Sequence, residues 1–361
     1  MEFVINGRFL TQRTTGVQRY AHELLRALDA ILDTDSDTKI TILSPRLNGA
    51  SPPLRNIELR QIGYLQGHAW EQFELPWYSK GKTLFCPGNT APALSLLRKQ
   101  RVVVTVHDLS YLYFPSAYSM AFRAWYGMII PLILKQADQV ITVSESERNA
   151  ILSYYPNVAS RLNAIQNGGI PSDSELKRTG SGAEASNFVL YVGSLSKRKN
   201  FPGVLAVACR LARERNLRFI FVGGATGGIS GENIEIPSDV AGQITMTGQV
   251  DDFRTLISYY RRAACLLFPS FYESSGLPPI EAMACGCPVI ASNIPALRER
   301  CGDAAVYCNP YDIESICASV VQIMDNTDVR TGLRALGYQR AAKFTWETCA
   351  RRTLDVIKHI S

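Results

Sequence analysis

Short apolar runs alternate with amphipathic helical patterns along nearly the whole chain, and this alternation limits the possible folds more than any other feature. Strands are predicted over 3–5, 39–43, 57–62, 83–86, 101–106, 139–143, 188–192, 218–222, 244–246, 265–268, 288–291 and 305–307. Helices fit between them, for example over 17–32, 201–215 and 253–262. Repeated strand-then-helix units are typical of an α/β fold with parallel sheets flanked by helices.

The 361 residues are too many for one compact core and predict two domains. Composition changes near Gly169, where turn-forming and polar residues without periodicity follow. We therefore expect an N-terminal Rossmann-like domain over 1–170, a linker over 171–186 and a C-terminal Rossmann-like domain over 187–343. The two domains are expected to face each other across a cleft. In the last segment, 344–361, an apolar stripe from Trp346 to Ile360 predicts a helix that docks on its own domain or on the first one.

Composition excludes several classes of protein. Hydrophobic residues make up 46% and charged residues 19% of the chain, which excludes a mainly disordered protein. The longest apolar run, Gly127–Leu134, is far shorter than the roughly 20 residues that cross a bilayer. No charged-then-apolar leader precedes Phe3, so we expect a cytoplasmic protein.

The charge distribution favours a small anionic ligand or an anionic membrane surface. The net charge is +6, of which +4 falls in the part up to Gly169. No run of Lys and Arg interleaved with aromatic residues indicates nucleic acid. The nine cysteines and four histidines show no metal-ligand spacing, and the cysteines are interpreted as small reduced hydrophobes.

The segment 268–289 carries the most specific pattern. A buried strand ends in a turn that contains Glu273 and Gly276, and Pro279 is expected at an early position of the next helix. Amide groups at such a helix start, near Gly276 and Leu277, favour an anion. Glu281 is expected in the first helical turn, so one carboxylate stands on each side of an anion site, as suits a sugar nucleotide. Alternatively, Glu273 is a solvated loop residue and Glu281 only complements the helix dipole.

Other candidate residues follow predicted strands or precede predicted helices. Each has a plainer interpretation: a solvated basic turn at 197–199, a satisfied strand-end pair at His107 and Asp108, and a permissive turn glycine at Gly16. Gly223–Gly228 looks like a phosphate loop but is better explained by tight turning.

The segment 268–289 resembles the signature of family 4 glycosyltransferases, which are retaining enzymes with the GT-B fold of two facing Rossmann-like domains. The loop 191–200, the His107-Asp108 pair, the helix start at 143–146 and the segment 344–347 also match this family. The last of these resembles the start of a final helix that crosses back to the first domain. The resemblance covers nearly the whole chain and is weakest over 40–100.

The resemblance implies roles for particular residues. Catalytic roles fall on His107 near the donor sugar, on Arg198 and Lys199 at the pyrophosphate, and on Glu273 at the hydroxyls of the transferred sugar. Glu281 would bind the ribose. Further substrate-binding residues are Gly16, Gly193, Ser194, Ser275, Gly276 and Leu277. Two positions depart from the family pattern: Ser194 stands where many members have arginine, and Ser275 where an aromatic residue is common.

The chemistry implied is transfer from a nucleotide diphosphate sugar without a metal or other cofactor. No Asp pair of the metal-chelating kind ends a strand, and Asp251-Asp252 is better interpreted as a helix cap. Attack from the front face, assisted by the leaving phosphate, needs no protein nucleophile, so catalysis would depend on positioning and leaving-group stabilisation.

Similarity to the mannosyltransferase-like branch of O-antigen and capsule synthesis implies mannose from GDP-mannose. The acceptor would be a glycan or polyprenyl-linked glycan at the inner face of the cytoplasmic membrane. The aromatic and lightly basic segment 116–136 is either a membrane-contacting surface or an ordinary buried helix. Two other functions stay open: a nucleotide-sugar 2-epimerase of the same fold, and a catalytically silent nucleotide- or glycan-binding protein.

Overall fold

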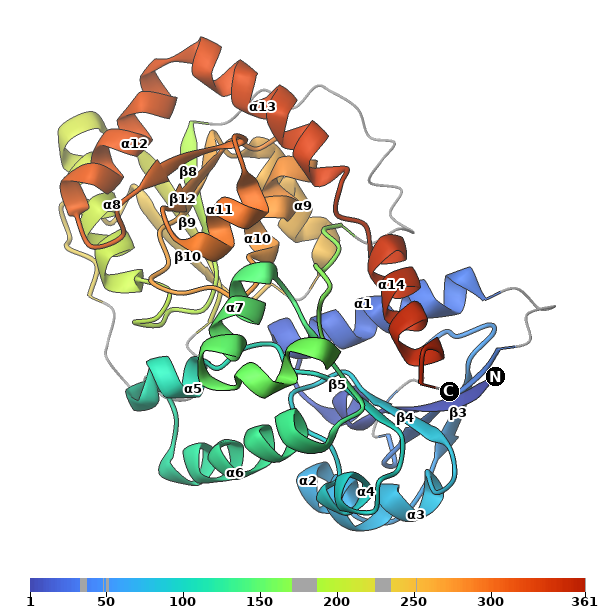
Figure 1. The fold of residues 1–361 in the computed structure, drawn as a ribbon. Coiled ribbons are helices and arrows are strands. Elements are labelled where there is room, and N and C mark those ends of the chain that lie inside the picture. Colours follow the sequence, from blue (N-terminus) through green and yellow to red (C-terminus); the bar gives the residue numbers. More distant parts are fainter. Residues whose placement is uncertain are drawn as a thin grey trace. The chain divides into compact units, whose positions relative to one another are not determined.

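The computed structural model describes residues 1–32, 38–47, 49, 52–170, 187–224, 235–250 and 252–360. The segment predicted as a linker, 171–186, lies outside the described residues. The chain divides into two compact units, each built around its own sheet (Figure 1). The first unit is Met1–Pro115, Met120–Ser172 and Thr345–Ser361, and the second is Ser116–Ser119 and Asp173–Phe344.

In the first unit, the described residues form a seven-stranded sheet in the order β3-β2-β1-β4-β5-β6-β7. Its strands are β1 (Glu2–Asn6), β2 (Lys39–Ser44), β3 (Glu58–Gln61), β4 (Thr83–Cys86), β5 (Val102–Thr105), β6 (Gln139–Thr142) and β7 (Leu162–Ala164). Its helices are α1 (Gly16–Ile31), α2 (Gly67–Ala69), α3 (Leu75–Tyr78), α4 (Ala93–Leu97), α5 (Ser110–Tyr113), α6 (Met120–Gln136), α7 (Glu145–Tyr154) and α14 (Trp346–Lys358). A π-helical turn, Trp70–Glu74, joins α2 to α3.

The final helix completes the first unit. Helix α14 lies beside α1, so the red and blue ends of the chain meet (Figure 1). The indole of Trp346 is buried and donates a hydrogen bond of 3.1 Å to the carbonyl of Gly169. The apolar stripe allowed the last helix to dock on either domain, and in the structure it docks on the first unit.

In the second unit, the described residues form a six-stranded sheet in the order β10-β9-β8-β11-β12-β13. Its strands are β8 (Phe188–Val192), β9 (Arg218–Val222), β10 (Ile244–Gly248), β11 (Cys265–Phe268), β12 (Val289–Ser292) and β13 (Ala305–Cys308). Its helices are α8 (Phe201–Arg215), α9 (Phe253–Arg262), α10 (Leu277–Ala284), α11 (Pro295–Cys301), α12 (Ile313–Asp325) and α13 (Thr327–Ala341). Helix α8 packs on α12, while α10 packs on α9, α11 and α13.

The strand pairings explain the sequence pattern. Every pairing between described strands is parallel. The central strands β5 and β11 are buried at every residue, because helices cover both faces of a parallel sheet. All nine cysteines are buried, as expected of small hydrophobes. The predicted α/β class with parallel sheets is confirmed.

None of the helices in the described part of the chain combines the length and the apolar character needed to cross a bilayer.

Candidate active site

The candidate residues of the second unit gather where the strand order reverses. Strands β8 and β11 are neighbours, but the chain continues from β8 toward β9 on one side and from β11 toward β12 on the other. The loops that follow β8 and β11 therefore meet at the carboxyl edge of the sheet. Open α/β sheets bind their ligands in the crevice at this point.

Lys199 and Glu273 form an ion pair across these two loops. Nζ of Lys199 donates a hydrogen bond to Oε1 of Glu273, and the two side chains are only 12% and 7% exposed. The ammonium also lies 4.9 Å from the ring centroid of Phe268, the last residue of β11. A cation held here beside a carboxylate, in a partly desolvated place, acts on a ligand more strongly than it would in bulk water.

Further hydrogen bonds hold the two loops together. The amide of Phe271 donates to the carbonyl of Arg198 at 3.1 Å, and the guanidinium of Arg198 lies 3.5 Å from the carbonyl of Tyr272. Tyr191 donates its hydroxyl to the carbonyl of Ser194 at 2.8 Å. Burial, with a contribution from the charge of Glu273, raises the pKa of Tyr191, so this donor keeps its proton.

Gly193 and Gly223 bring the loops after β8 and β9 into contact. A Cβ on Gly223 would lie 1.9 Å from the carbonyl oxygen of Gly193, and φ at Gly223 is +146°. Only glycine fits this close approach. The interpretation of this glycine-rich stretch as a tight turn holds for residues 223 and 224, while 225–228 lie outside the described residues.

The helix after Glu273 begins earlier than predicted. Gly276 is its N-cap with φ +68°, and α10 starts at Leu277, so the two prolines occupy the second and third helical positions. Proline is accommodated there because the first-turn amides have no acceptor within the helix. Since proline lacks an N–H group, only Leu277 and Ile280 supply amides among the first four helical residues.

Glu281 is consequently in the second turn of α10, and the expectation of a first-turn position was wrong. Its side chain is fully buried, and Oε2 accepts a hydrogen bond of 3.0 Å from the hydroxyl of Tyr260 in α9. Ser275, next to the N-cap, is also buried. The structure thus brings Lys199, Glu273, Ser275 and Gly276 together on the two loops and places the Glu281 carboxylate beneath them, inside the unit.

His107 follows β5 in the first unit and is buried. Its Nε2 lies 2.9 Å from the carbonyl of Pro87, and its amide donates to Oδ1 of Asn89 at 2.6 Å. Burial lowers the pKa of His107 and keeps the ring neutral, so Nε2–H donates to the carbonyl. The ring thus has a backbone carbonyl as its partner, and its role near the donor sugar stays a prediction.

Ser144 and Glu147 have the spacing of a capping box, in which each side chain accepts from the other residue's amide, but the structure shows only the Ser144 half. Ser144 accepts from the amide of Glu147 at 3.0 Å, as predicted for the N-cap of α7. The Glu147 carboxylate instead accepts from the amide of Leu109 at 3.0 Å, which fixes the loop that carries His107. In the second unit, Asp252 caps α9 by accepting from the amides of Arg254 and Thr255, as predicted, while Asp251 lies outside the described residues.

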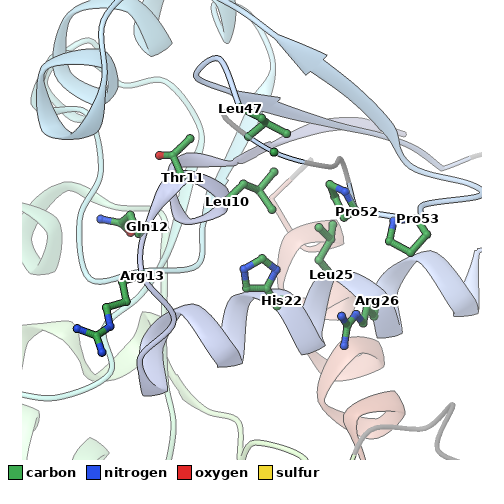
Figure 2. A pocket seen from close by; sticks show the side chains of 11 residues that line it. Leu10, Thr11, Gln12, Arg13, His22, Leu25, Arg26, Leu47, Pro52 and Pro53 are labelled. Atoms are coloured by element: carbon green, nitrogen blue, oxygen red, sulfur yellow. The ribbon is translucent and has the colours of Figure 1, made fainter. Parts of the chain in front are cut away.

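Gly16 is the first residue of α1 and has open space around it. A Cβ there would meet no atom within 4 Å. The loop before it lines a cavity of about 550 Å³, into which His22 and Leu25 project from α1 toward Leu10 (Figure 2). The residues lining this cavity are Leu10, Thr11, Gln12, Arg13, His22, Leu25, Arg26, Leu47, Gly49, Pro52 and Pro53.

Helix α6 covers most of the segment 116–136 and is buried on one side only. Its second half buries Ile129, Ile130, Ile133 and Leu134. Met120 and Met128 are 84% and 60% exposed. The helix is therefore an ordinary packed helix with an exposed apolar edge.

One group of polar residues in the first unit has no counterpart in the sequence analysis. Arg8, His68, Glu71 and Thr90 come together after β1 and β4. His68 and Glu71 are three residues apart, whereas Arg8 and Thr90 join them only through the topology of the sheet. Among the described residues, no cluster of three or more His, Cys, Asp or Glu side chains has the arrangement to hold a metal ion.

Comparison with known proteins identifies the family that this chain resembles. The family model described as Glycosyl transferases group 1 matches residues 173–340, and the model Glycosyltransferase Family 4 matches residues 81–169. O-antigen chain mannosyltransferase B of Escherichia coli is 28% identical over 72% of this chain and 71% of its own length. O-antigen chain mannosyltransferase RfbU of Salmonella typhimurium is 27% identical over 89% of this chain and 90% of its own length.

A solved structure shares the fold. Sucrose-phosphate synthase from Thermosynechococcus elongatus superposes with a TM-score of 0.72 at 22% identity, covering 99% of this chain and 98% of that one. The fold class predicted from the sequence, GT-B, is confirmed by this match.

Proposed function

The chain belongs to the family 4 glycosyltransferases, and we propose that it transfers mannose from GDP-mannose to a growing, lipid-linked surface glycan. Retaining transfer from a nucleotide sugar is the activity of the family. The names of two relatives, both O-antigen mannosyltransferases, support mannose as the sugar and a surface glycan as the acceptor.

The Lys199–Glu273 pair at the reversal of strand order carries the proposal. In the donor, an anionic diphosphate is bonded directly to a sugar ring that carries hydroxyl groups. A lysine beside a glutamate offers a cation for the diphosphate and, close to it, a hydrogen-bond acceptor for the hydroxyl groups. As the bond to the sugar breaks, negative charge grows on the diphosphate, and Lys199 with Arg198 stabilises it. This leaving-group stabilisation makes the transfer metal-independent in our proposal.

The other residues complete the donor site in this proposal. The backbone at Ser275, Gly276 and Leu277 contacts the sugar and phosphate at the start of α10. Gly193 and Ser194 shape the loop that carries Lys199. The Glu281 carboxylate, oriented by Tyr260, accepts from the ribose hydroxyls. In the first unit, His107 lies near the donor sugar and Gly16 allows the backbone to approach the phosphates.

Calorimetry with a panel of nucleotide sugars tests the donor. GDP-mannose should bind, and UDP-glucose, ADP-glucose and dTDP-glucose should bind at least about tenfold more weakly, a difference of about 1.4 kcal/mol. Lys199→Ala and Glu281→Ala should both lower the affinity for the nucleotide sugar that binds most tightly. A clear preference for another base would overturn the GDP-mannose assignment while leaving the family activity intact.

Transfer itself is tested with radiolabelled GDP-mannose and membranes from a bacterium that makes a mannose-containing surface glycan. Label should enter the organic-extractable lipid-linked fraction with retained anomeric configuration. Release of GDP that does not depend on the membrane fraction would contradict a glycan acceptor and indicate hydrolysis with water as the acceptor. Conversion of GDP-mannose into another GDP-sugar without release of GDP would favour epimerisation. Binding of the donor with no turnover under any condition would favour a silent binding protein.

A further inference from the structure

The first unit has a second point where strand order reverses, between β1 and β4. The segments that follow these two strands carry Asn6 and Arg8 on one side, and Asn89 and Thr90 on the other. All four side chains are buried. By the rule that applies to open α/β sheets, a ligand is expected in the crevice here as well.

A buried ion pair lies at this edge of the sheet. The Glu71 carboxylate accepts from Nε of Arg8 at 3.2 Å, from Asn6 at 2.6 Å and from the hydroxyl of Thr90 at 2.8 Å. Its side chain is 1% exposed and that of Arg8 is 9% exposed. Buried ion pairs contribute little net stability because both charges lose their hydration. Stability alone therefore does not explain this pair, and Glu71 lies in a π-helical turn, a feature frequent at functional sites.

The network reaches the surface at His68. Its Nδ1 lies 3.3 Å from Oε2 of Glu71 and its Nε2 lies 3.5 Å from Nη1 of Arg8. Since the guanidinium can only donate, Nε2 accepts and Nδ1–H donates, which fixes the orientation of the imidazole. The side chain is nevertheless 45% exposed.

Aromatic rings of α6 border the same place. Trp125 packs edge-on against His68 with ring centroids 5.5 Å apart. Its indole N–H is buried and finds no acceptor among the residues that the structure describes. Beside it, Tyr126 stacks on Phe122 at 3.9 Å. This edge of the sheet thus combines aromatic side chains with oriented polar groups.

The crevice adjoins the loop of His107. Burial raises the pKa of Tyr126 to about 12, and a hydrogen bond with Asn89 partly offsets this rise. Asn89 in turn accepts from the amide of His107 at 2.6 Å. One asparagine therefore connects the aromatic residues to the histidine that the proposed function places near the donor sugar.

We infer that His68, Trp125 and Tyr126 form the binding subsite for the acceptor saccharide, with the Arg8–Glu71 pair as its positioning residues. This inference rests on the proposed function. Aromatic surface with a few oriented polar groups is the usual construction of a small-molecule site and suits a sugar, which has apolar C–H faces and hydroxyl edges. Because the charges of Arg8 and Glu71 cancel, the subsite favours a neutral sugar over an anionic one.

Saturation-transfer NMR tests the inference with methyl α-mannoside and methyl N-acetyl-β-glucosaminide as probes. The wild-type protein should bind at least one of them. His68→Ala and Trp125→Phe should each weaken that binding about five- to tenfold, as for one lost hydrogen bond of ordinary net strength, and leave GDP binding within about twofold. Trp125→Phe keeps an aromatic ring at this position but removes the indole N–H group and part of the aromatic surface. His359→Ala, an exposed histidine on the last turn of the chain, is the matched control.

Glu71→Gln tests the positioning role. It should raise the KM for the acceptor with little change in the KM for the donor, and Glu71→Asp should recover part of the loss. Unaltered sugar binding in both His68→Ala and Trp125→Phe, or binding of neither sugar by a wild-type protein that binds GDP, would overturn the subsite. If the wild-type protein binds no nucleotide at all, the proposed function fails instead.

Discussion

Nζ of Lys199 donates a hydrogen bond to the carboxylate of Glu273 across the loops that follow β8 and β11. The cation proposed for the diphosphate and the carboxylate proposed for the sugar are therefore each other's partner before a donor arrives. In the proposed function, a bound donor would replace this mutual contact by two contacts to the ligand. The two residues should consequently differ in what they do when removed.

Lys199→Met should weaken GDP binding about 10- to 100-fold, as for the loss of a charge-assisted hydrogen bond. Glu273→Gln should not weaken GDP binding, because Lys199 no longer has a competing carboxylate, yet it should reduce transfer. Calorimetry and initial rates measure the two effects. Lys197→Met, an exposed lysine of the same loop, is the control. Equal loss of GDP binding in Glu273→Gln and Lys199→Met would contradict the division of roles.

Two glycine substitutions should distinguish a structural role from a role in ligand binding. Gly276→Ala places a Cβ 2.7 Å from Leu297 at φ +68° and should destabilise the protein by about 1–3 kcal/mol. Gly16→Ala meets no atom within 4 Å and should leave the thermal midpoint unchanged. If the donor phosphates approach Gly16, this variant should nevertheless lower kcat/KM. Full activity in Gly16→Ala would show that the residue only begins α1.

Gly168→Ala should disturb the docking of α14. The added Cβ would lie 2.4 Å from the Trp346 ring and 2.5 Å from its backbone nitrogen. A buried ring and a backbone atom cannot move aside without disturbing the packing around them. Overpacking of this kind costs about 1–3 kcal/mol, to be measured by urea unfolding. Gly332→Ala, inside α13 with nothing within 4 Å, should instead stabilise by up to about 1 kcal/mol. A neutral Gly168→Ala would show that α14 is not tightly docked.

Acid should destabilise the folded chain partly through His107. Burial lowers its pKa below the ordinary 6.5, so the unfolded chain binds this proton first as the pH falls. Stability that is present above pH 6.5 is therefore lost as the pH drops from there toward the lowered pKa. His107→Gln should lose less stability than the wild-type protein between pH 7.5 and about 5.5. Parallel losses in the two proteins would show that His107 does not titrate in this window.

The exposed edge of α6 should mediate any contact with a membrane. Met120→Ser and Met128→Ser remove apolar side chains that are 84% and 60% exposed, so folding should be unaffected. Co-sedimentation with vesicles containing anionic lipid should fall in the double variant if this edge enters the interface. Leu336→Ser, an exposed apolar position in α13, is the matched control. Equal sedimentation of the three proteins would exclude a role for this edge.

Strands of the second unit could be predicted closely because each is a short apolar run between turn-forming residues. The bounds of β8, β9 and β11 and of helices α8 and α9 agree with the sequence-based ones. Strand β7 was missed, since three residues with a central Asn163 give no apolar run.

Motif residues could be found in the sequence, whereas contacts between distant segments could not. The loops that carry Lys199 and Glu273 were recognised from their local pattern, but their pairing depends on the order of strands in the sheet. The Arg8–Glu71 pair could not be predicted either, because it too depends on the order of strands in the sheet. The start of α10 was misjudged because either of two adjacent prolines fits a first helical turn.

The hydrogen bond between Trp346 and Gly169 joins positions 177 residues apart, with the whole second unit encoded between them. During synthesis, the first 170 residues leave the ribosome without the helix that covers α1. At about 5–20 residues per second, the gap lasts roughly 10–35 s. For that time the buried face of α1 is exposed to solvent and to other chains. The first unit therefore completes its fold only after α14 has left the ribosome, whereas all strands and helices of the second unit are synthesised before that point.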